Sequence, residues 1–340
     1  YRPLQELSYM INYAVWGLNP PGFHLTNLVL HLLAAFLLFL VIVELSGNRI
    51  AALAASSIYL VHPLNIEAVA YIAGRADCLM GVFFLAAFYL YMKENNIILS
   101  SLFFILALLS KEIAIMLPAI LILYDVTFRG KIKIKNYLPF VTILIIYGVL
   151  RATLLNFHYP VAAIPEGVGF YERLLTAFRA LQEYFRLIIL PLDLHMERVL
   201  VFSKSFFEKD VLLSSTILAA VVIVMFFLRR RNKLAFFGLG WFFITLFPLS
   251  NIPFALNATL AEHWLYLPLM GIAMFYSSLC PASVGTITGR KNAHYVIFLI
   301  LSICAVIYFS TATINQNTKW RDSETLYKYT MKYAGDSPRL

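Results

Sequence analysis

The sequence predicts an all-α polytopic membrane protein. Of its 340 residues, 61% are hydrophobic and only 13% are charged, and the mean hydropathy is +0.78. Soluble domains carry about 45–50% apolar and about 25% charged residues. A soluble fold would have to cover its surface with Leu, Ile and Phe. The composition therefore excludes a soluble enzyme, a disordered chain and a nucleic-acid-binding domain.

Ten apolar segments are candidate membrane crossings. The sustained apolar runs 137–155 and 294–314 are the clearest. The segments 50–61, 97–109 and 113–128 are too short to face lipid across a whole bilayer, so we expect them to be internal or broken. The remaining candidates are 24–46, 79–92, 211–228, 234–249 and 264–280.

Basic residues set the predicted orientation. The short loops 129–136 and 229–233 are dense in Arg and Lys, so the positive-inside rule places them in the cytoplasm. The inner loops and helix ends then hold 12 of the 27 basic residues but 3 of the 18 acidic ones (Glu44, Glu94 and Asp125), a difference equal to the whole net charge of +9. Membrane topology thus accounts for the basic charge, and both chain ends are predicted outside the cytoplasm.

The stretch HPLNIEAVAYIAGRADC is the most informative of the predicted outer segments. Pro63 suits the first position of a helix, where a missing amide proton costs nothing. His62 is either the cap of that helix or a phosphate ligand. Glu67, Tyr71 and Arg75 are four residues apart and would share one helical face. Because polar residues alternate with Ala, Val and Ile, we expect this helix to lie along the membrane interface.

Two further outer segments carry charges. Lys111 and Glu112 interrupt an apolar run, which is costly unless they form an ion pair or face a wet cavity. The segment 171–190 sets Arg and Glu against Leu, Phe and Ile, which predicts an interfacial or re-entrant helix. Charged residues thus gather at the outer mouths of the crossings, where they could handle a headgroup or a lipid phosphate.

No metal site is predicted. His24, Asn27 and His31 lie on one stripe of the first crossing, but no carboxylate or third His joins them. Interhelical hydrogen bonding is the commoner role of such residues in membranes. Trp264 and Tyr266, where the chain re-enters the membrane, suit the headgroup level.

Five motifs occur in an order that resembles the transmembrane and tetratricopeptide-repeat O-mannosyltransferases and their prokaryotic relatives. The motifs are YRPL…FHLTNLVLH, HPLNIEAVAYIAGRAD, SKE…P…YD, AEHWLYLPLMG and NTKWRD. The resemblance covers nearly the whole chain and implies a GT-C-like bundle of about ten helices with helices in its outer loops. It divides the chain into a transmembrane domain at 1–314 and the start of a tetratricopeptide-repeat region at 315–340.

The resemblance implies an enzyme that moves a hexose, with mannose the first choice, from a polyprenyl-phosphate carrier to a protein acceptor on the extracytoplasmic side. The acceptor would be held by tetratricopeptide repeats, and no other cofactor is implied. The membrane would be the plasma membrane or, in a eukaryote, that of the endoplasmic reticulum. A first span and an acidic motif that supplies the general base are expected upstream of Tyr1, so the 340-residue chain is expected to be inactive alone.

Cations near the leaving phosphate oxygen would lower the barrier to such a transfer. Arg75 is the first candidate, because its planar fork binds two phosphate oxygens, and Lys111 and His62 follow. Alternatively, Arg75 pairs with Glu67 or Asp77 and stabilises the loop helix. Substrate-binding or orienting roles fall to Glu67, Glu112, Glu262 and His263, the last at a position where the family pattern has Arg.

Two other classes of protein stay open. A transporter or flippase for a lipid-linked substrate would show internal repeats and charges at mid-depth in several spans, whereas this sequence has no convincing repeat. A membrane anchor that only presents the repeat region to partners would not need charges at the outer mouths.

Overall fold

The computed structural model describes residues 2–93, 96–154, 168–256, 258–281 and 290–334. These residues are helical and form no β-strand, apart from one isolated bridge between Arg198 and Leu260. The predicted fold class, an all-α polytopic membrane protein, is confirmed. The predicted inner acid Glu94 and the end of the tail, 335–340, lie outside the described residues.

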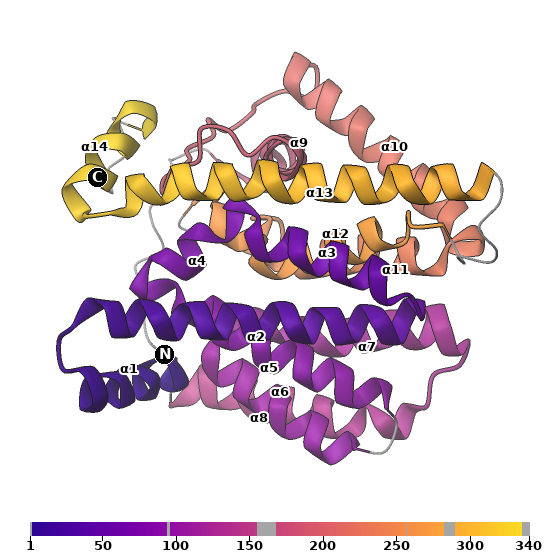
Figure 1. Ribbon diagram of the computed structural model, residues 1–340, viewed down its shortest axis with the longest axis horizontal. Coiled ribbons are helices and arrows are strands. Elements are labelled where there is room, and N and C mark those ends of the chain that lie inside the picture. Colours follow the sequence, from indigo (N-terminus) through magenta and orange to yellow (C-terminus); the bar gives the residue numbers. More distant parts are fainter. Residues whose placement is uncertain (1, 94–95, 155–167, 257, 282–289, 335–340) are drawn as a thin grey trace.

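A set of helices that lie side by side forms the body of the bundle (Figure 1). They are α2 (Pro20–Ser46), α3 (Arg49–Val61), α5 (Arg75–Met92), α6 (Ile97–Ser110) and α13 (Arg290–Asn317). The other α-helices are α1 (Pro3–Trp16), α4 (Ile66–Ala70), α7 (Leu117–Tyr124), α8 (Leu138–Thr153), α9 (Phe170–Ile189), α10 (Lys209–Arg231), α11 (Lys233–Leu246), α12 (Tyr266–Ser277) and α14 (Ser323–Ala334). Short helical turns are η1 (Pro63–Asn65), η2 (Ile72–Gly74), η3 (Glu112–Met116), η4 (Asp125–Arg129), η5 (Ile134–Asn136), η6 (Phe247–Leu249), η7 (Glu262–Leu265) and η8 (Thr318–Trp320).

Four described segments are long and apolar enough to cross a membrane: α2, Ile72–Met92, α10 and Ala293–Trp320. A fifth is counted if α3 and the following segment Pro63–Ala70, which are bent by 53°, form one broken span. The other predicted crossings fall on shorter helices, among them α6, α8 and Lys233–Leu249. The number of ten membrane crossings therefore stays a prediction. The length and composition of the described helices support four or five of them.

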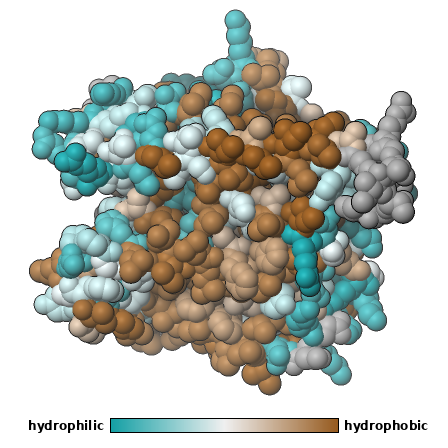
Figure 2. All heavy atoms as spheres, viewed as in Figure 1, coloured by the Kyte–Doolittle hydropathy of each residue, from teal (hydrophilic) through white to brown (hydrophobic). Residues whose placement is uncertain are grey.

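The predicted outer segments gather at one end of the bundle. Helices α1, α4 and α14 lie at the left of Figure 1, whereas the α2–α3 and α10–α11 turns lie at the right. Helix α9 is seen nearly end-on and so lies across the bundle, as an interfacial or re-entrant helix would. Figure 2 shows a broad hydrophobic surface between ends that are richer in hydrophilic residues. This arrangement suits a bilayer that surrounds the middle of the bundle.

Helices α11 and α12 pack backbone against backbone. A Cβ atom at Gly238 would lie 2.5 Å from the carbonyl oxygen of Gly271, and a Cβ at Gly271 would lie equally close to that of Gly238. Small residues commonly allow such close approach between membrane helices. One turn away, the buried Trp241 packs edge-on against Phe84 and Phe88 of α5, with ring centroids 5.3 and 5.4 Å apart. This packing fixes α12, and with it the preceding turn η7, against the rest of the bundle.

Candidate functional site

The stretch HPLNIEAVAYIAGRADC does not form one helix, contrary to the prediction. Tyr71 has an extended backbone (φ −81°, ψ 121°) that ends α4. Turn η2 then folds back so closely that a Cβ at Gly74 would lie 2.4 Å from the carbonyl oxygen of Glu67. Glu67, Tyr71 and Arg75 therefore do not share a helical face. Nor does α4 lie along the membrane interface, because protein buries it.

His62 caps the turn η1, and its capping role is confirmed. Its Nδ1 atom accepts a hydrogen bond from the amide of Leu64 at 3.3 Å, and Pro63 stands at the first position of the turn as predicted. Its Nε2 atom lies 3.0 Å from the carbonyl oxygen of Ile188 in α9 and donates to it in the tautomer that the cap requires. Both ring nitrogens of His62 are therefore already engaged in hydrogen bonds to protein groups.

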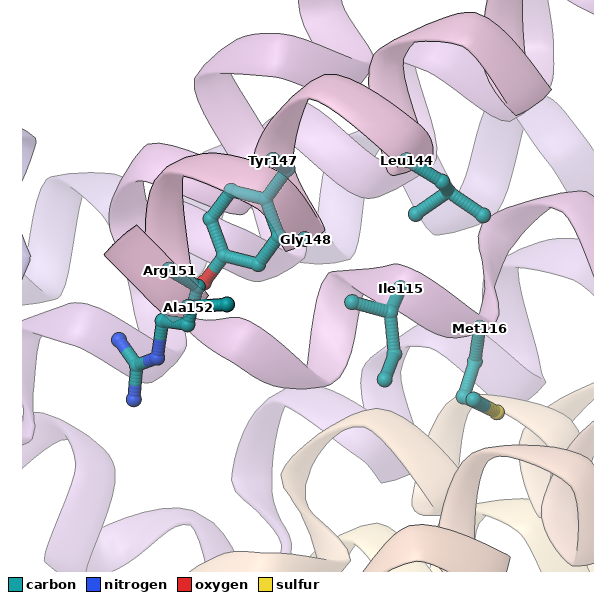
Figure 3. Close-up of a pocket in the computed structure, with 7 residues that line it drawn as sticks. All are labelled: Ile115, Met116, Leu144, Tyr147, Gly148, Arg151 and Ala152. Atoms are coloured by element: carbon teal, nitrogen blue, oxygen red, sulfur yellow. The ribbon is translucent and has the colours of Figure 1, made fainter. Parts of the chain in front are cut away.

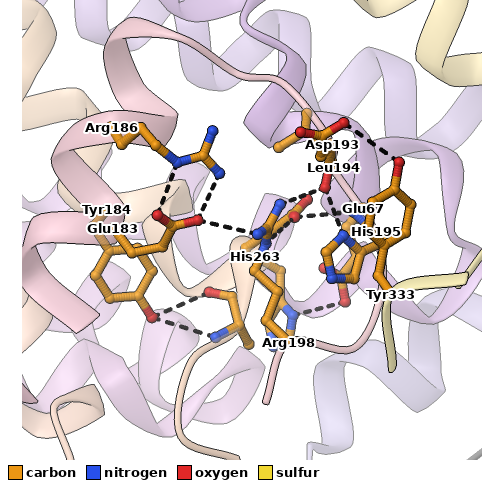
Figure 4. Close-up of polar contacts among 12 residues, drawn as sticks. Glu67, Glu183, Tyr184, Arg186, Asp193, Leu194, His195, Arg198, His263 and Tyr333 are labelled. Carbon is orange, nitrogen blue, oxygen red and sulfur yellow. Dashed lines mark hydrogen bonds and ion pairs between the residues drawn. The ribbon is translucent and has the colours of Figure 1, made fainter. Parts of the chain in front are cut away.

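Two arginines and two carboxylates form a network beside α4 (Figure 4). Arg198 donates through Nε to Glu262 at 2.7 Å and through Nη1 to Glu183 at 3.1 Å. Arg186, one turn after Glu183 on α9, donates to the same carboxylate at 2.8 and 2.6 Å. These four residues are called the arginine–carboxylate network below. It joins α9, η7 and the connection between α9 and α10.

Glu262 is the buried member of this network. Burial raises the pKa of Glu262 to about 7, although the nearby Arg198 and the hydrogen bond from the amide of His195 (3.0 Å) favour its charged form. The neighbouring Glu67 raises this pKa further. The charged form of Glu262 is therefore less favoured than that of an exposed glutamate.

His263 and Glu67 meet beside this network. The His263 Nδ1 atom lies 2.7 Å from Glu67 Oε1. The other oxygen of Glu67 is buried and has no hydrogen-bond partner in the described part of the chain, and the side chain of His263 is 29% exposed. The fold thus joins the two longest motifs of the sequence and brings together three of the predicted substrate-binding residues, Glu67, Glu262 and His263.

Arg198 and His195 were missed by the sequence reasoning. The only local signal is the run DLHMER, which concentrates charged and polar residues in an otherwise apolar connection. Helix α14 also reaches this loop: Tyr333 stacks on His195 with ring centroids 4.6 Å apart, and its hydroxyl donates to Asp193 Oδ1 at 3.3 Å (Figure 4). The C-terminal helix is therefore docked on the candidate site.

Arg75, the first candidate for the donor phosphate, has no exposed surface. Its Nε atom donates to Asn27 Oδ1 at 2.7 Å, Nη1 to Ser8 Oγ at 3.2 Å and Nη2 to the carbonyl oxygen of Phe23 at 3.0 Å. The guanidinium also lies over the Tyr9 ring, 4.6 Å from its centroid. Arg75 thus joins α1 to α2. The alternative prediction, that Arg75 forms an ion pair with Glu67 or Asp77, is wrong, because its guanidinium is surrounded by neutral acceptors.

One reading of the sequence predicted that Lys111 and Glu112 form an ion pair with each other. The structure shows that they do not. Lys111 donates to both carboxylate oxygens of Asp77 at 2.6 and 2.8 Å, and both side chains are largely buried. Glu112 instead pairs with Arg2, whose Nη2 lies 2.9 Å from Glu112 Oε1. The two neighbours in sequence therefore belong to different ion pairs, one enclosed and one half-exposed.

The assignments for Asn27 and His31 and for Trp264 and Tyr266 have clear outcomes. Asn27 and His31 make interhelical hydrogen bonds, as predicted: Asn27 accepts from Arg75, and His31 Nδ1 lies 3.0 Å from the Tyr266 hydroxyl. Trp264 and Tyr266 do not face the headgroups, contrary to the prediction, because packing against the bundle leaves them 8% and 0% exposed. No group of three or more His, Cys, Asp or Glu side chains suited to a metal ion occurs among the described residues.

A groove of about 530 Å³ opens between η3 and α8. It is lined by Ile115, Met116, Leu144, Tyr147, Gly148, Arg151 and Ala152. Figure 3 shows Arg151 at one end of the lining side chains and Leu144 and Met116 at the other. Within the described residues, Arg151 has no hydrogen-bond or ion-pair partner, although Tyr147 interacts electrostatically with it and with the Arg2–Glu112 pair. The groove is thus apolar along its length and cationic at one end.

Known proteins share this sequence over long stretches. The protein O-mannosyl-transferase F38B6.6 of Caenorhabditis elegans is 26% identical over 346 aligned positions, which cover 96% of this chain and 48% of the worm protein. The chain is related to the protein O-mannosyl-transferases. Tmtc1 of Drosophila melanogaster is 40% identical over 121 residues, 34% of this chain and 14% of the fly protein. Human TMTC3 is 35% identical over 135 residues, 37% of this chain and 15% of the human protein.

This kinship confirms the family resemblance that the motifs predicted. The chain spans about half the length of the worm protein O-mannosyl-transferase and a smaller part of the other two. No protein-family model and no solved structure matches the chain.

Proposed function

We propose that this protein takes part in the transfer of mannose from a polyprenyl-phosphate carrier to a hydroxyl group of a protein acceptor. The names of its relatives support the sugar and the acceptor. The groove between η3 and α8 carries the proposal of a lipid-linked donor. The reaction takes place on the extracytoplasmic face of the plasma membrane or of the endoplasmic reticulum membrane, with the acceptor held by a repeat region that begins near α14.

The lipid tail of the donor lies along the apolar wall of the groove, and its phosphate pairs with Arg151. An arginine without a protein partner is costly within a membrane unless an anion or water meets it. A phosphate would satisfy the guanidinium with charge-assisted hydrogen bonds. The walls formed by Ile115, Met116 and Leu144 suit an isoprenoid chain, whose burial is favourable by about 25 cal/mol per Å².

Arg75, Lys111 and His62 have supporting roles in the proposal and do not touch the donor. All three are buried and bonded to protein groups. They hold α1, α5, α6 and α9 in place, so that Arg151 makes the direct phosphate contact. In this assignment all three side chains keep the hydrogen bonds that they already make, and His62 stays neutral in its capping tautomer.

The carboxylates orient the sugar and the acceptor. In the transfer, the acceptor hydroxyl gives its proton to a general base and its oxygen bonds to the anomeric carbon. The bond from that carbon to the phosphate oxygen breaks, and the carrier leaves as a phosphate monoester. Glu67 offers a buried oxygen without a partner in the described residues, which can accept a hydrogen bond from a substrate hydroxyl. His263 and Glu262 flank it, and Glu112 stands beside the groove, where it can bind a second hydroxyl.

Filling the groove tests the donor assignment. A Cβ added at Gly148 meets no atom within 4 Å, so Gly148→Leu fills open space without a clash. We expect Gly148→Leu and Arg151→Ala in the full-length protein to raise the donor KM by about 10-fold or more, as the loss of about 1.5–3 kcal/mol predicts. The measurement is transfer of labelled mannose from polyprenyl-phosphate mannose to an acceptor protein extract.

Ile145→Leu is the matched control, because this residue of α8 is 62% exposed and does not line the groove. It should leave the donor KM unchanged. Normal donor KM in both groove variants would overturn the donor site. Absence of mannose transfer by the well-folded wild-type protein would overturn the proposed reaction itself.

A further inference from the structure

Helix α1 turns its polar side toward the protein. Gln5 and Tyr9 donate hydrogen bonds to carbonyl oxygens of η2, at 2.8 and 2.9 Å, and Asn12 donates to the hydroxyl of Thr26 at 2.8 Å. Gln5 and Asn12 are buried although both are polar. One face of α1 is thus fixed to the bundle by hydrogen bonds.

The opposite side of α1 is apolar and open. Its exposed residues are Leu7 (49%), Met10 (69%), Ile11 (57%), Val15 (66%) and, just beyond the helix, Leu18 (84%). They recur every three or four residues and so form one stripe along the helix. Water is an unfavourable neighbour for such a stripe, because burying each side chain would gain about 1.5–3 kcal/mol. An amphipathic helix with its apolar face outward needs an apolar partner.

The membrane is the partner that the surroundings of α1 favour. Helix α1 lies beside the first turns of α2, a helix long and apolar enough to span a bilayer (Figure 1). The exposed side of α2 begins with Leu25 and continues through Leu28, Val29 and Leu32. Leu25 precedes Thr26, whose hydroxyl accepts the hydrogen bond from Asn12. Trp16 closes α1 and is 43% exposed, as suits a side chain at the headgroup level. The apolar stripe of α1 therefore continues the lipid-facing side of α2.

We propose that α1 is an interfacial helix whose stripe Leu7, Met10, Ile11, Val15 and Leu18 binds the acyl chains of the leaflet at that end of the bundle. Interfacial helices bury their apolar face about 5–10 Å into the boundary between headgroups and acyl chains. Arg2, at the N-terminal end of α1, pairs with Glu112 of η3. The helix therefore sets the depth of the charged end of the neighbouring groove relative to the membrane surface.

Lipid quenching of a fluorescent label tests this contact. The exposed Cys304 and half-buried Cys280 are first replaced by Ser, and Met10→Cys is then labelled with an environment-sensitive fluorophore in the full-length protein. The protein is reconstituted in phosphatidylcholine vesicles brominated either near the headgroup end or near the methyl end of the acyl chains. We expect quenching by the shallow bromines to exceed that by the deep ones by about twofold or more.

Lys328→Cys on α14 is the control, because its side chain is 70% exposed and belongs to a polar helix. Its label should be quenched by aqueous iodide and not by either lipid. Ile11→Cys repeats the test at a second position, so that a folding defect in one variant does not decide the result. Iodide quenching at both α1 positions would overturn the proposal. Shielding from iodide and bromine alike would also overturn it, because protein and not lipid would then cover the stripe.

Discussion

Arg75 and Arg151 lie toward the same end of the bundle and have opposite surroundings. Arg75 has no exposed surface, and all three nitrogens of its guanidinium donate to protein oxygens. Arg151 stands at the end of an open apolar groove with no hydrogen-bond or ion-pair partner in the described part of the chain. The first therefore resembles a structural arginine, whereas the second is free to meet an anion.

This difference teaches that residue type and motif do not identify the ligand-binding cation. Both arginines have the planar fork that suits a phosphate, and Arg75 is the one within a distinctive motif. Burial and the number of donors already used by the protein separate them.

Arg75→Ala should lower the free energy of unfolding by about 3–5 kcal/mol, because it leaves a cavity and several buried acceptors without a donor. The midpoint of thermal unfolding in detergent, followed by tryptophan fluorescence, measures this loss. A variant as stable as the wild type would remove the distinction between the two arginines.

Lys111→Met should destabilise the protein by about 3 kcal/mol, because Asp77 then stays buried without a counter-charge. The double variant Lys111→Met, Asp77→Asn should recover part of this loss. The same unfolding measurement on both variants checks it. If the double variant were less stable than Lys111→Met, the enclosed pair would owe its stability to something other than charge.

Glu262 should make stability fall as pH rises from about 4.5 to about 7, because its pKa is raised in the folded state. Protonation favours the folded protein below this range, and the charged carboxylate opposes it above, by about 3 kcal/mol. Glu262→Gln should flatten the difference between unfolding midpoints measured at about pH 5 and about pH 8. An unchanged difference would mean that another group, such as His195, carries the pH dependence.

Arg151→Ala should change stability least, by less than about 0.5 kcal/mol, because no protein group loses a hydrogen bond. The rise in donor KM expected for the same variant would then reflect lost binding rather than misfolding. A large fall in the unfolding midpoint would place Arg151 with Arg75 among the structural arginines.

Features that depend on neighbouring residues in the chain could be predicted from the sequence. Hydropathy located the helices, Pro63 and His62 marked the start of η1, and the alternation of charged and apolar residues predicted α9. Helix α1 was missed because its polar residues face the protein and its apolar residues face outward, a pattern that resembles a loop at a membrane surface. The broken stretch before Arg75 was missed because the fold-back at Gly74 depends on close contact with α4.

The sequence by itself determined which segments are apolar, which residues can cap a helix and which carry charge, because these properties are local. Only the tertiary structure decided which charges pair. Lys111 has an extended backbone (φ −157°, ψ 139°), which points its side chain away from that of its neighbour Glu112 and toward Asp77 on another helix. Glu67 and His263 meet across nearly two hundred residues for the same reason: helix packing, and not sequence distance, brings ionic groups within reach.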